Sequence, residues 1–307
     1  MAGLSVRTVI KRHRIIKEMA DFLESSLYKG SVKVKFFPES HQYWVNGKRK
    51  TGVTTLIGIK DKSRALMTWK GQRIIDYLLK KLKTGKIDER AIVIASYIDE
   101  IEKEEAAAFG SAIHEWAEGY INFKLKKSKV MPDMPEIKQV QVGVNAFLDW
   151  EKEHKVKFLS SERVVYSKKH DFIGKMDIEA KIDGDLCLVD LKSSNGLYNA
   201  VNLQTAAYLR ADEEESGREY KGRWAVRLAK YDEAEHIERE EKKQFIKRIV
   251  AEYRKSEYKE YPIPEYQAFE AKYLDPQDGL IDRDYKAFLH AKELYLWDKE
   301  TDFFLNR

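Results

Sequence analysis

The chain has 307 residues, of which 43% are hydrophobic and 12% aromatic, and these fractions are typical of a globular protein. Charged residues make up 35% of the chain, and both signs are mixed along its length, which indicates solvated helix surfaces and argues against disorder. The net charge of +5 and the pI of about 8.8 support nucleic-acid binding only weakly, because many ordinary proteins reach such values.

Cys187 is the one cysteine of the sequence, which excludes a disulfide within the chain and any zinc or iron–sulfur site built on several cysteines. A single thiol suits a reducing compartment. No apolar run approaches the ~20 residues of a membrane span, so no membrane partner is expected. We therefore expect a cytoplasmic protein.

The N-terminal segment is basic, since its first acidic residue is Glu18. Five lysines and arginines precede that glutamate, among them Arg7, Lys11, Arg12 and Arg14. This composition is compatible with a mitochondrial transit peptide. We favour an amphipathic surface helix with Val6, Ile10 and Ile15 facing inward.

The N-terminal half reads as helices around one hairpin. A helix is predicted over residues 5–28, and a hairpin over residues 32–52, in which Asn46-Gly47 is the turn pair. Helical patterns then cover three segments: about 63–83, 88–127 with a break, and 135–154.

Residues 156–193 change character, because they are rich in Val, Ile, Phe and Tyr. Three strands are predicted there, near residues 157–166, 173–182 and 185–193. A helix at about 199–214 and a strand at 223–230 follow, and helices are predicted for most of the remainder. This order of elements implies one α+β or α/β core wrapped in helices.

The strongest local pattern lies in residues 174–192, where Asp183-Gly184 separates two alternating runs. Asp-Gly in that position signals a two-residue hairpin loop. The register that follows from such a loop sets Asp177 directly opposite Asp190.

Alternation along this hairpin assigns its two faces. One face carries only apolar pairs and is expected to face the core: Met176/Leu191, Ile178/Val189 and Ala180/Cys187. The other face carries Asp177 and Asp190, with Lys192 two residues along on the same side. Two carboxylates whose Cβ atoms are only ~4.5–5.5 Å apart need a proton, a cation or both. A hard divalent ion would satisfy them, and the lysine could stabilise a phosphoryl oxygen or orient a water molecule.

Two alternatives to a metal site stay open. The hairpin could lie on the surface with its charges facing solvent. A longer loop would shift the register and separate the two aspartates.

Residues 172–194 resemble the core of the RecB-like branch of the PD-(D/E)XK nucleases. In that branch, an Asp on one strand and an Asp/Glu-x-Lys on the next bind Mg²⁺ or Mn²⁺; the corresponding residues here are Asp177 and Asp190-Leu191-Lys192. The resemblance implies one or two ions, with the backbone carbonyl of Leu191 as a further ligand. It also implies a restriction-endonuclease-like core, a central mixed sheet flanked by helices, with extra N- and C-terminal helices.

Three flanking segments are similar to motifs of the same branch. Gly110 and His114 resemble its Gly-x-x-x-His motif, whose histidine is an additional metal ligand. Gln204 and Tyr208 resemble its Gln-x-x-x-Tyr motif, which helps to hold the DNA backbone near the scissile phosphate. Phage exonucleases and mitochondrial genome maintenance exonucleases carry a segment similar to residues 52–57, Gly-Val-Thr-Thr-Leu-Ile.

Several of these residues also have plain structural interpretations. His114 lies at the edge of an apolar helix stripe, and Tyr208 could be a core residue. Related nucleases often place a glutamate near the metal at the position of Glu162, for which a surface location is the alternative. Trp44, Trp69 and Trp116 could stack on unpaired bases, although the core is the expected place for most of them.

The resemblance implies a single nuclease domain over residues 1–307. Its expected parts are an N-terminal helical and hairpin elaboration (1–105), a catalytic core (106–230) and a C-terminal helical extension (231–307). The iron–sulfur members of the branch need four cysteines, so no cluster is expected, and the absence of a Gly-x-x-x-x-Gly-Lys-Ser/Thr loop argues against a bound nucleotide.

The resemblance implies the activity of a metal-dependent DNA exonuclease acting on DNA ends or single strands in phage-type recombination, replication or repair. The cell would be bacterial or phage-infected. DNA is the expected partner, and a recombinase or a single-strand-binding protein is a further candidate. The alternatives are a structure-specific endonuclease and a non-catalytic DNA-binding module on a nuclease fold.

Overall fold

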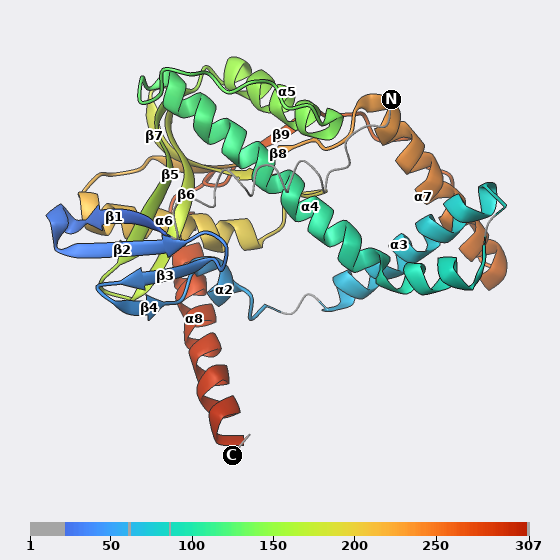
Figure 1. Ribbon diagram of the computed structural model, residues 1–307, viewed down its shortest axis with the longest axis horizontal. Helices are drawn as coiled ribbons and strands as arrows, with labels where there is room; N and C mark the ends of the chain where they lie inside the picture. The colour runs from blue at the N-terminus through green and yellow to red at the C-terminus, as the bar shows by residue number, and fades with distance from the viewer. Residues whose placement is uncertain (1–21, 61–62, 86, 306–307) are drawn as a thin grey trace.

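The computed structural model describes residues 22–60, 63–85 and 87–305, and these residues form two β-sheets with surrounding helices (Figure 1). Seven α-helices lie within these ranges. The mixed α and β class expected from the sequence is therefore confirmed.

The smaller sheet is an antiparallel meander of four strands in the order β1-β2-β3-β4. Its strands are β1 (Leu23–Leu27), β2 (Val32–Phe37), β3 (Gln42–Val45) and β4 (Lys48–Lys50), with a short 3-10 helix η1 (Tyr28–Gly30) after β1. Residues of β2 alternate between buried and exposed, because one face of the meander packs against Tyr166 and Ile173 of the larger sheet. The hairpin predicted over residues 32–52 is confirmed.

The larger sheet has five strands in the order β5-β6-β7-β8-β9. They are β5 (Lys157–Ser167), β6 (Phe172–Ile182), β7 (Asp185–Lys192), β8 (Gly222–Leu228) and β9 (Phe269–Tyr273). β7 and β8 are parallel, and helix α6 (Ala200–Ser216) makes the crossover between them; every other pair of neighbours is antiparallel. The prediction of a mixed central sheet is confirmed.

Helices cover both faces of the larger sheet. Helices α4 (Glu89–Lys124) and α5 (Lys138–Glu153) pack on one face and form with it the α4-side cluster, which includes Phe147, Ile178, Val189 and Leu191. Helices α2 (Val53–Ile57), α6 and α8 (Leu280–Leu305) pack on the other face and form the α6-side cluster, which includes Met176, Leu188, Tyr208 and Phe288.

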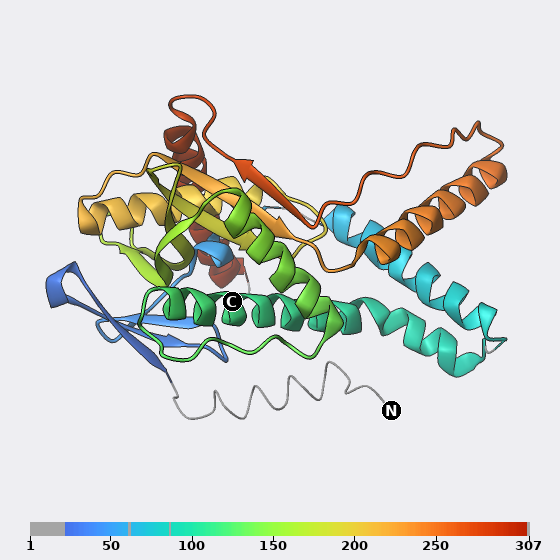
Figure 2. The ribbon, with the colours of Figure 1, turned by 90° about the horizontal axis from the view of Figure 1, so that it is seen from above.

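Helices α3 (Ser63–Lys83) and α7 (Glu233–Arg254) extend away from the two sheets beside the first turns of α4 (Figure 2). Ion pairs join these helices: the Lys70 and Asp99 side chains lie 3.1 Å apart, and those of Lys242 and Asp76 lie 2.8 Å apart. Among the described residues, no helix is both long enough and apolar enough to cross a membrane.

Three predictions about elements were wrong. Of the helix predicted over residues 5–28, residues 5–21 lie outside the described part, but Leu23–Leu27 form strand β1, because every residue of this segment pairs with β2. The break expected within 88–127 is absent, since α4 continues through Gly110 and Gly119. Strand β9 comes from a segment expected to be helical, although its sequence Phe-Glu-Ala-Lys-Tyr alternates apolar and polar residues.

Candidate metal centre

The hairpin of β6 and β7 has the register predicted from Asp183-Gly184. Ile182 pairs with Asp185, and the ladder continues to the pair of Ile178 and Val189. Both loop residues have positive φ, 53° at Asp183 and 94° at Gly184, as a tight turn of this kind requires. The alternative of a longer loop is therefore wrong.

The regular alternation of side chains along β6 is interrupted at Asp177. Residues two apart in a regular strand share a face, yet Met176 belongs to the α6-side cluster while Ile178 belongs to the α4-side cluster. Leu191, expected to share a face with Met176, packs in the α4-side cluster. The prediction of a continuous apolar face through Met176 and Leu191 was wrong, because the alternation of β6 changes at Asp177.

Strand β5 also departs from regular strand geometry next to this point, at Glu162. This residue lies between the residues paired with Ile178 and Met176, opposite Asp177, and its φ is 53°. A non-glycine residue in this left-handed region within a strand stores strain, and such residues gather at functional sites. The local twist lets the Glu162 and Asp177 side chains point into one space.

Helix α4 brings a third side chain into that space. A Cβ atom at Gly110 would lie 2.8 Å from Ser193 Oγ, so the helix approaches the end of β7 more closely than a larger residue would allow. One turn later, His114 Nδ1 lies 3.6 Å from Glu162 Oε1 and 3.7 Å from Asp177 Oδ1. Ligand atoms of these three residues all lie within 4.8 Å of one another, which is close enough to share one metal ion.

Asp177 is also held by the neighbouring strand. The backbone amide of Leu191 donates a hydrogen bond of 2.8 Å to Asp177 Oδ2, while Oδ1 faces His114. Leu191 therefore lies beside the site through its backbone, and its side chain packs in the α4-side cluster.

Asp190 is buried next to this group. Its side chain is 1% exposed, and Lys192 Nζ lies 2.5 Å from its Oδ2. Within the described residues, Oδ1 of Asp190 has no hydrogen-bond partner. A buried carboxylate oxygen without a donor is costly, and a cation bound there would remove that cost. The interpretation of a surface hairpin with solvated charges is wrong for this residue.

The carboxylate oxygens of this donor set suit a hard divalent cation, and the imidazole adds one softer nitrogen donor, which Mn²⁺ accepts. The tight group contains His114, Glu162 and Asp177, whereas Asp190 is not among the residues within 4.8 Å of one another. The structure thus brings together three of the four residues predicted as side-chain ligands, His114, Glu162 and Asp177, and leaves Asp190 outside this group.

Burial and the neighbouring charges shift the pKa values of the side chains in this site. Burial alone would lower the pKa of His114, but the carboxylates of Asp177 and Glu162 raise it to about 9. Burial, together with the nearby charge of Asp190, raises the pKa of Asp177 to about 6. Burial would also lower the pKa of Lys192, but Asp190 and Asp177 raise it, so this side chain is an ammonium ion at neutral pH.

The predicted pair on α6 also lies at the site. Gln204 Nε2 donates a hydrogen bond of 3.2 Å to Tyr208 Oη, which confirms that the two side chains share one helix face. The Tyr208 ring is 4% exposed and lies against Gly174, where a Cβ atom would be 2.2 Å from Cε1. Burial, with the charges of Asp190 and Asp177, raises the pKa of Tyr208 well above its usual value, so the hydroxyl keeps its proton.

Two residues near the site were not predicted. Lys175 of β6 forms an ion pair with Glu162. Tyr43 of β3 lies near the same group, where burial and the charges of Glu162 and Asp177 raise its pKa to about 12. The strand pattern around Tyr43 was visible in the sequence, but no local signal tied that strand to the acidic group.

The chain was compared with protein-family models and with curated proteins, and neither comparison gave a match.

Proposed function

We propose that the chain is a divalent-metal-dependent deoxyribonuclease that hydrolyses phosphodiester bonds. The observation that carries this proposal is the group of His114, Glu162 and Asp177 beside the buried pair of Asp190 and Lys192. Carboxylates with an imidazole suit Mg²⁺ or Mn²⁺, and a lysine on the same strand as an aspartate ligand suits a reaction at a phosphate. The RecB-like pattern of the sequence supports the same activity.

In this proposal, His114, Glu162, Asp177 and Asp190 would hold one or two ions, with the Leu191 carbonyl as a further ligand. A bound ion would supply charge to the phosphate and lower the pKa of water. The Lys192 ammonium donates hydrogen bonds to a phosphoryl oxygen or orients the attacking water, because its raised pKa keeps it protonated.

In the same proposal, Gln204 and Tyr208 of α6 would hold the DNA backbone. Gln204 is partly exposed and offers its amide, and the Tyr208 hydroxyl retains the proton it needs to donate a hydrogen bond. The hydrogen bond between the two side chains fixes their relative position.

Exonuclease action, a phage-type recombination or repair role, a recombinase or single-strand-binding protein as partner, and a cytoplasmic location rest on the resemblance. A structure-specific endonuclease uses the same chemistry. Exonuclease and endonuclease are therefore distinguished by whether DNA without ends is cut.

The test is digestion of linear and circular single-stranded DNA, and of duplex labelled at either end, with Mg²⁺, Mn²⁺ or EDTA. We expect linear DNA to be degraded with metal, circular single strands to survive and EDTA to stop the reaction. Cleavage of the circles would establish an endonuclease instead. Binding without cleavage under every metal condition would support the non-catalytic module and overturn the proposal.

Variants of the site locate the activity. Lys192→Ala should lower the rate by about 10²–10³-fold while DNA binding is kept, because an electrostatic stabiliser of the transition state is lost. Lys181→Ala is the matched control, since Lys181 is exposed on the same hairpin away from the acidic group. Equal rates for Lys192→Ala and the control would refute the assignment.

A further inference from the structure

The outer face of the N-terminal meander combines aromatic and basic side chains. The register places Lys35 opposite Trp44, and Trp44 opposite Arg49, so the three side chains form one row across β2, β3 and β4. Residues paired directly in neighbouring strands share a face, and Val34 and Val45 occupy the other, buried face. Trp44 is 37% exposed, whereas Trp116 is buried with its indole N–H bonded to the Asp133 carbonyl.

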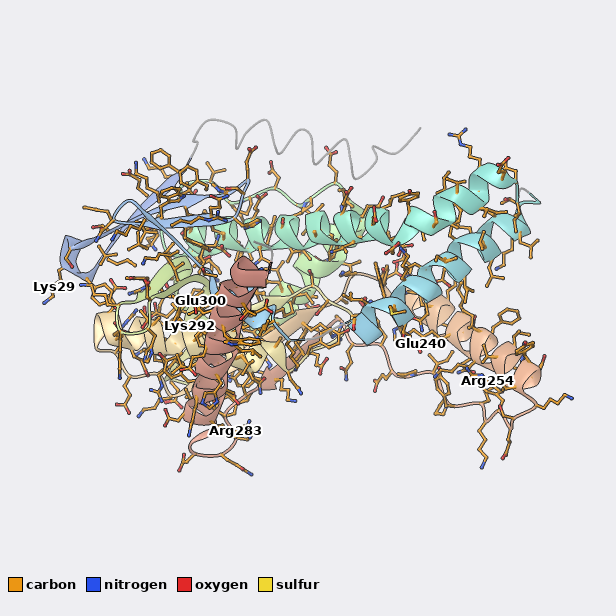
Figure 3. The ribbon with its side chains drawn as sticks, turned by 90° about the horizontal axis from the view of Figure 1, so that it is seen from below. Lys29, Glu240, Arg254, Arg283, Lys292 and Glu300 are labelled. Carbon is orange, nitrogen blue, oxygen red and sulfur yellow. The ribbon has the colours of Figure 1, made fainter. Side chains whose placement is uncertain are left out.

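Further side chains of the same kind surround this row. The ring of Phe37, two residues beyond Lys35 on β2, lies 5.6 Å from the ring of Phe22, and the two planes are tilted by 51°. The Lys35 ammonium lies 4.0 Å from the centre of the Phe22 ring and 3.4 Å from Glu24, the acidic residue of this face. Lys33 lies two residues before Lys35 on β2, and Lys29 lies at the far end of the meander (Figure 3). The face is therefore an aromatic surface with an excess of positive charge.

The meander also borders the acidic group. Tyr43, which precedes Trp44 in β3, lies on the opposite face and pairs with Phe36 of β2. The ammonium of Lys175, which forms an ion pair with Glu162, lies 5.4 Å from the centre of the Phe36 ring. Lys50 of β4 pairs with Tyr43 in the sheet and makes an ion pair of 2.7 Å with Asp171. The meander itself therefore lies between the outer row and the acidic group.

We propose that this outer face, centred on Trp44 with Lys35 and Arg49, binds the unpaired bases of single-stranded DNA whose backbone leads to the acidic site. An exposed aromatic ring stacks on any base, and flanking cations neutralise the backbone phosphates. A duplex hides its base faces and gains only the charge contacts. The choice of DNA rests on the proposed nuclease function, and it adds that the substrate enters as a single strand.

The test is fluorescence anisotropy with a labelled oligo(dT) and a blunt duplex of the same length, using full-length protein in EDTA so that no cleavage occurs. Trp44→Ala should weaken oligo(dT) binding roughly 5- to 100-fold, the loss expected for one stacked base, and leave duplex binding within about twofold. Trp297→Ala is the matched control, because Trp297 is 60% exposed on α8, outside the meander, and it should bind like the wild type.

The charge of the row gives a second readout. Lys35→Gln and Arg49→Gln should each reduce the slope of log affinity against log salt by about 0.7 for oligo(dT), the value for one phosphate contact to a single strand. Unchanged slopes in both variants would overturn the role of these cations.

Three results would overturn the proposal: oligo(dT) binding by Trp44→Ala equal to that of the wild type, an equal loss for single strand and duplex, or tighter binding of oligo(rU) than of oligo(dT). A wild-type protein that binds oligo(dT) through Trp44 but cuts no DNA with Mn²⁺ would refute the nuclease and keep the binding face. If the wild type cuts DNA normally and Trp44→Ala binds oligo(dT) as tightly as the wild type, the binding face is refuted and the nuclease is kept.

Discussion

Gly174→Ala tests the fit of β6 against α6 beside the site. A Cβ atom at residue 174 would lie 2.2 Å from Cε1 and 2.9 Å from Cδ1 of Tyr208. Carbon atoms in contact prefer about 3.5–4.0 Å, so the ring would have to move by roughly 1.5 Å. Tyr208 is 4% exposed in the α6-side cluster, so its neighbours would have to move as well. Overpacking of this kind costs about 1–3 kcal/mol of unfolding free energy.

The assay is equilibrium urea unfolding of four proteins: the wild type, Gly174→Ala, Tyr208→Ala and the double variant. Tyr208→Ala should cost about 3–5 kcal/mol, because a large buried ring is lost. In that background the clash is absent, so Gly174→Ala should become neutral or stabilise by about 0.5–1 kcal/mol, the usual advantage of alanine over glycine in a strand.

Gly196→Ala is the matched control for this cycle, because a Cβ atom there would meet nothing within 4 Å and the backbone φ is not positive. It should change the unfolding free energy by no more than about 0.5 kcal/mol. An unchanged stability for Gly174→Ala, or strictly additive effects in the double variant, would refute the packing argument.

Three other predictions follow from single features. Gly184→Ala should lower the unfolding free energy by about 1 kcal/mol in urea, because φ is 94° in the hairpin loop and alanine is strained there; an unchanged midpoint would contradict the turn. Mn²⁺ should raise the melting temperature of the wild type, with about 2.7 kcal/mol of stabilisation at 100 times the Kd, and His114→Ala should lose most of this shift; equal shifts would remove His114 from the ligands. Burial alone would raise the pKa of Asp171, but hydrogen bonds from Lys50 and Tyr166 lower it, so its contribution to stability is present above the unfolded pKa of about 3.9 and is lost as pH falls through the lower folded value. Asp171→Asn should therefore destabilise the protein at pH 7 and do so less at pH 3, and a difference that grows on acidification would contradict the sign.

The sequence by itself determined much of the local structure. Asp183-Gly184 fixed a tight turn and so the register of β6 and β7, because the turn geometry and the alternation of side chains are short-range properties. Helices α3, α5 and α6 follow from their periodicity for the same reason. Strand β1 could not be predicted, since only its pairing with β2 makes it a strand.

The sequence also named the members of the candidate site, but only the tertiary structure decided how they meet. Alternation along β6 predicted Asp177 opposite Asp190, whereas the change of face at Asp177, with the positive φ of Glu162, turns Asp177 toward Glu162 and His114. The approach of α4 depends on the space that Gly110 leaves at Ser193, residues far apart along the chain. Spacing within one strand or helix is written locally in the sequence, while the distance between side chains on different elements is set by how those elements pack.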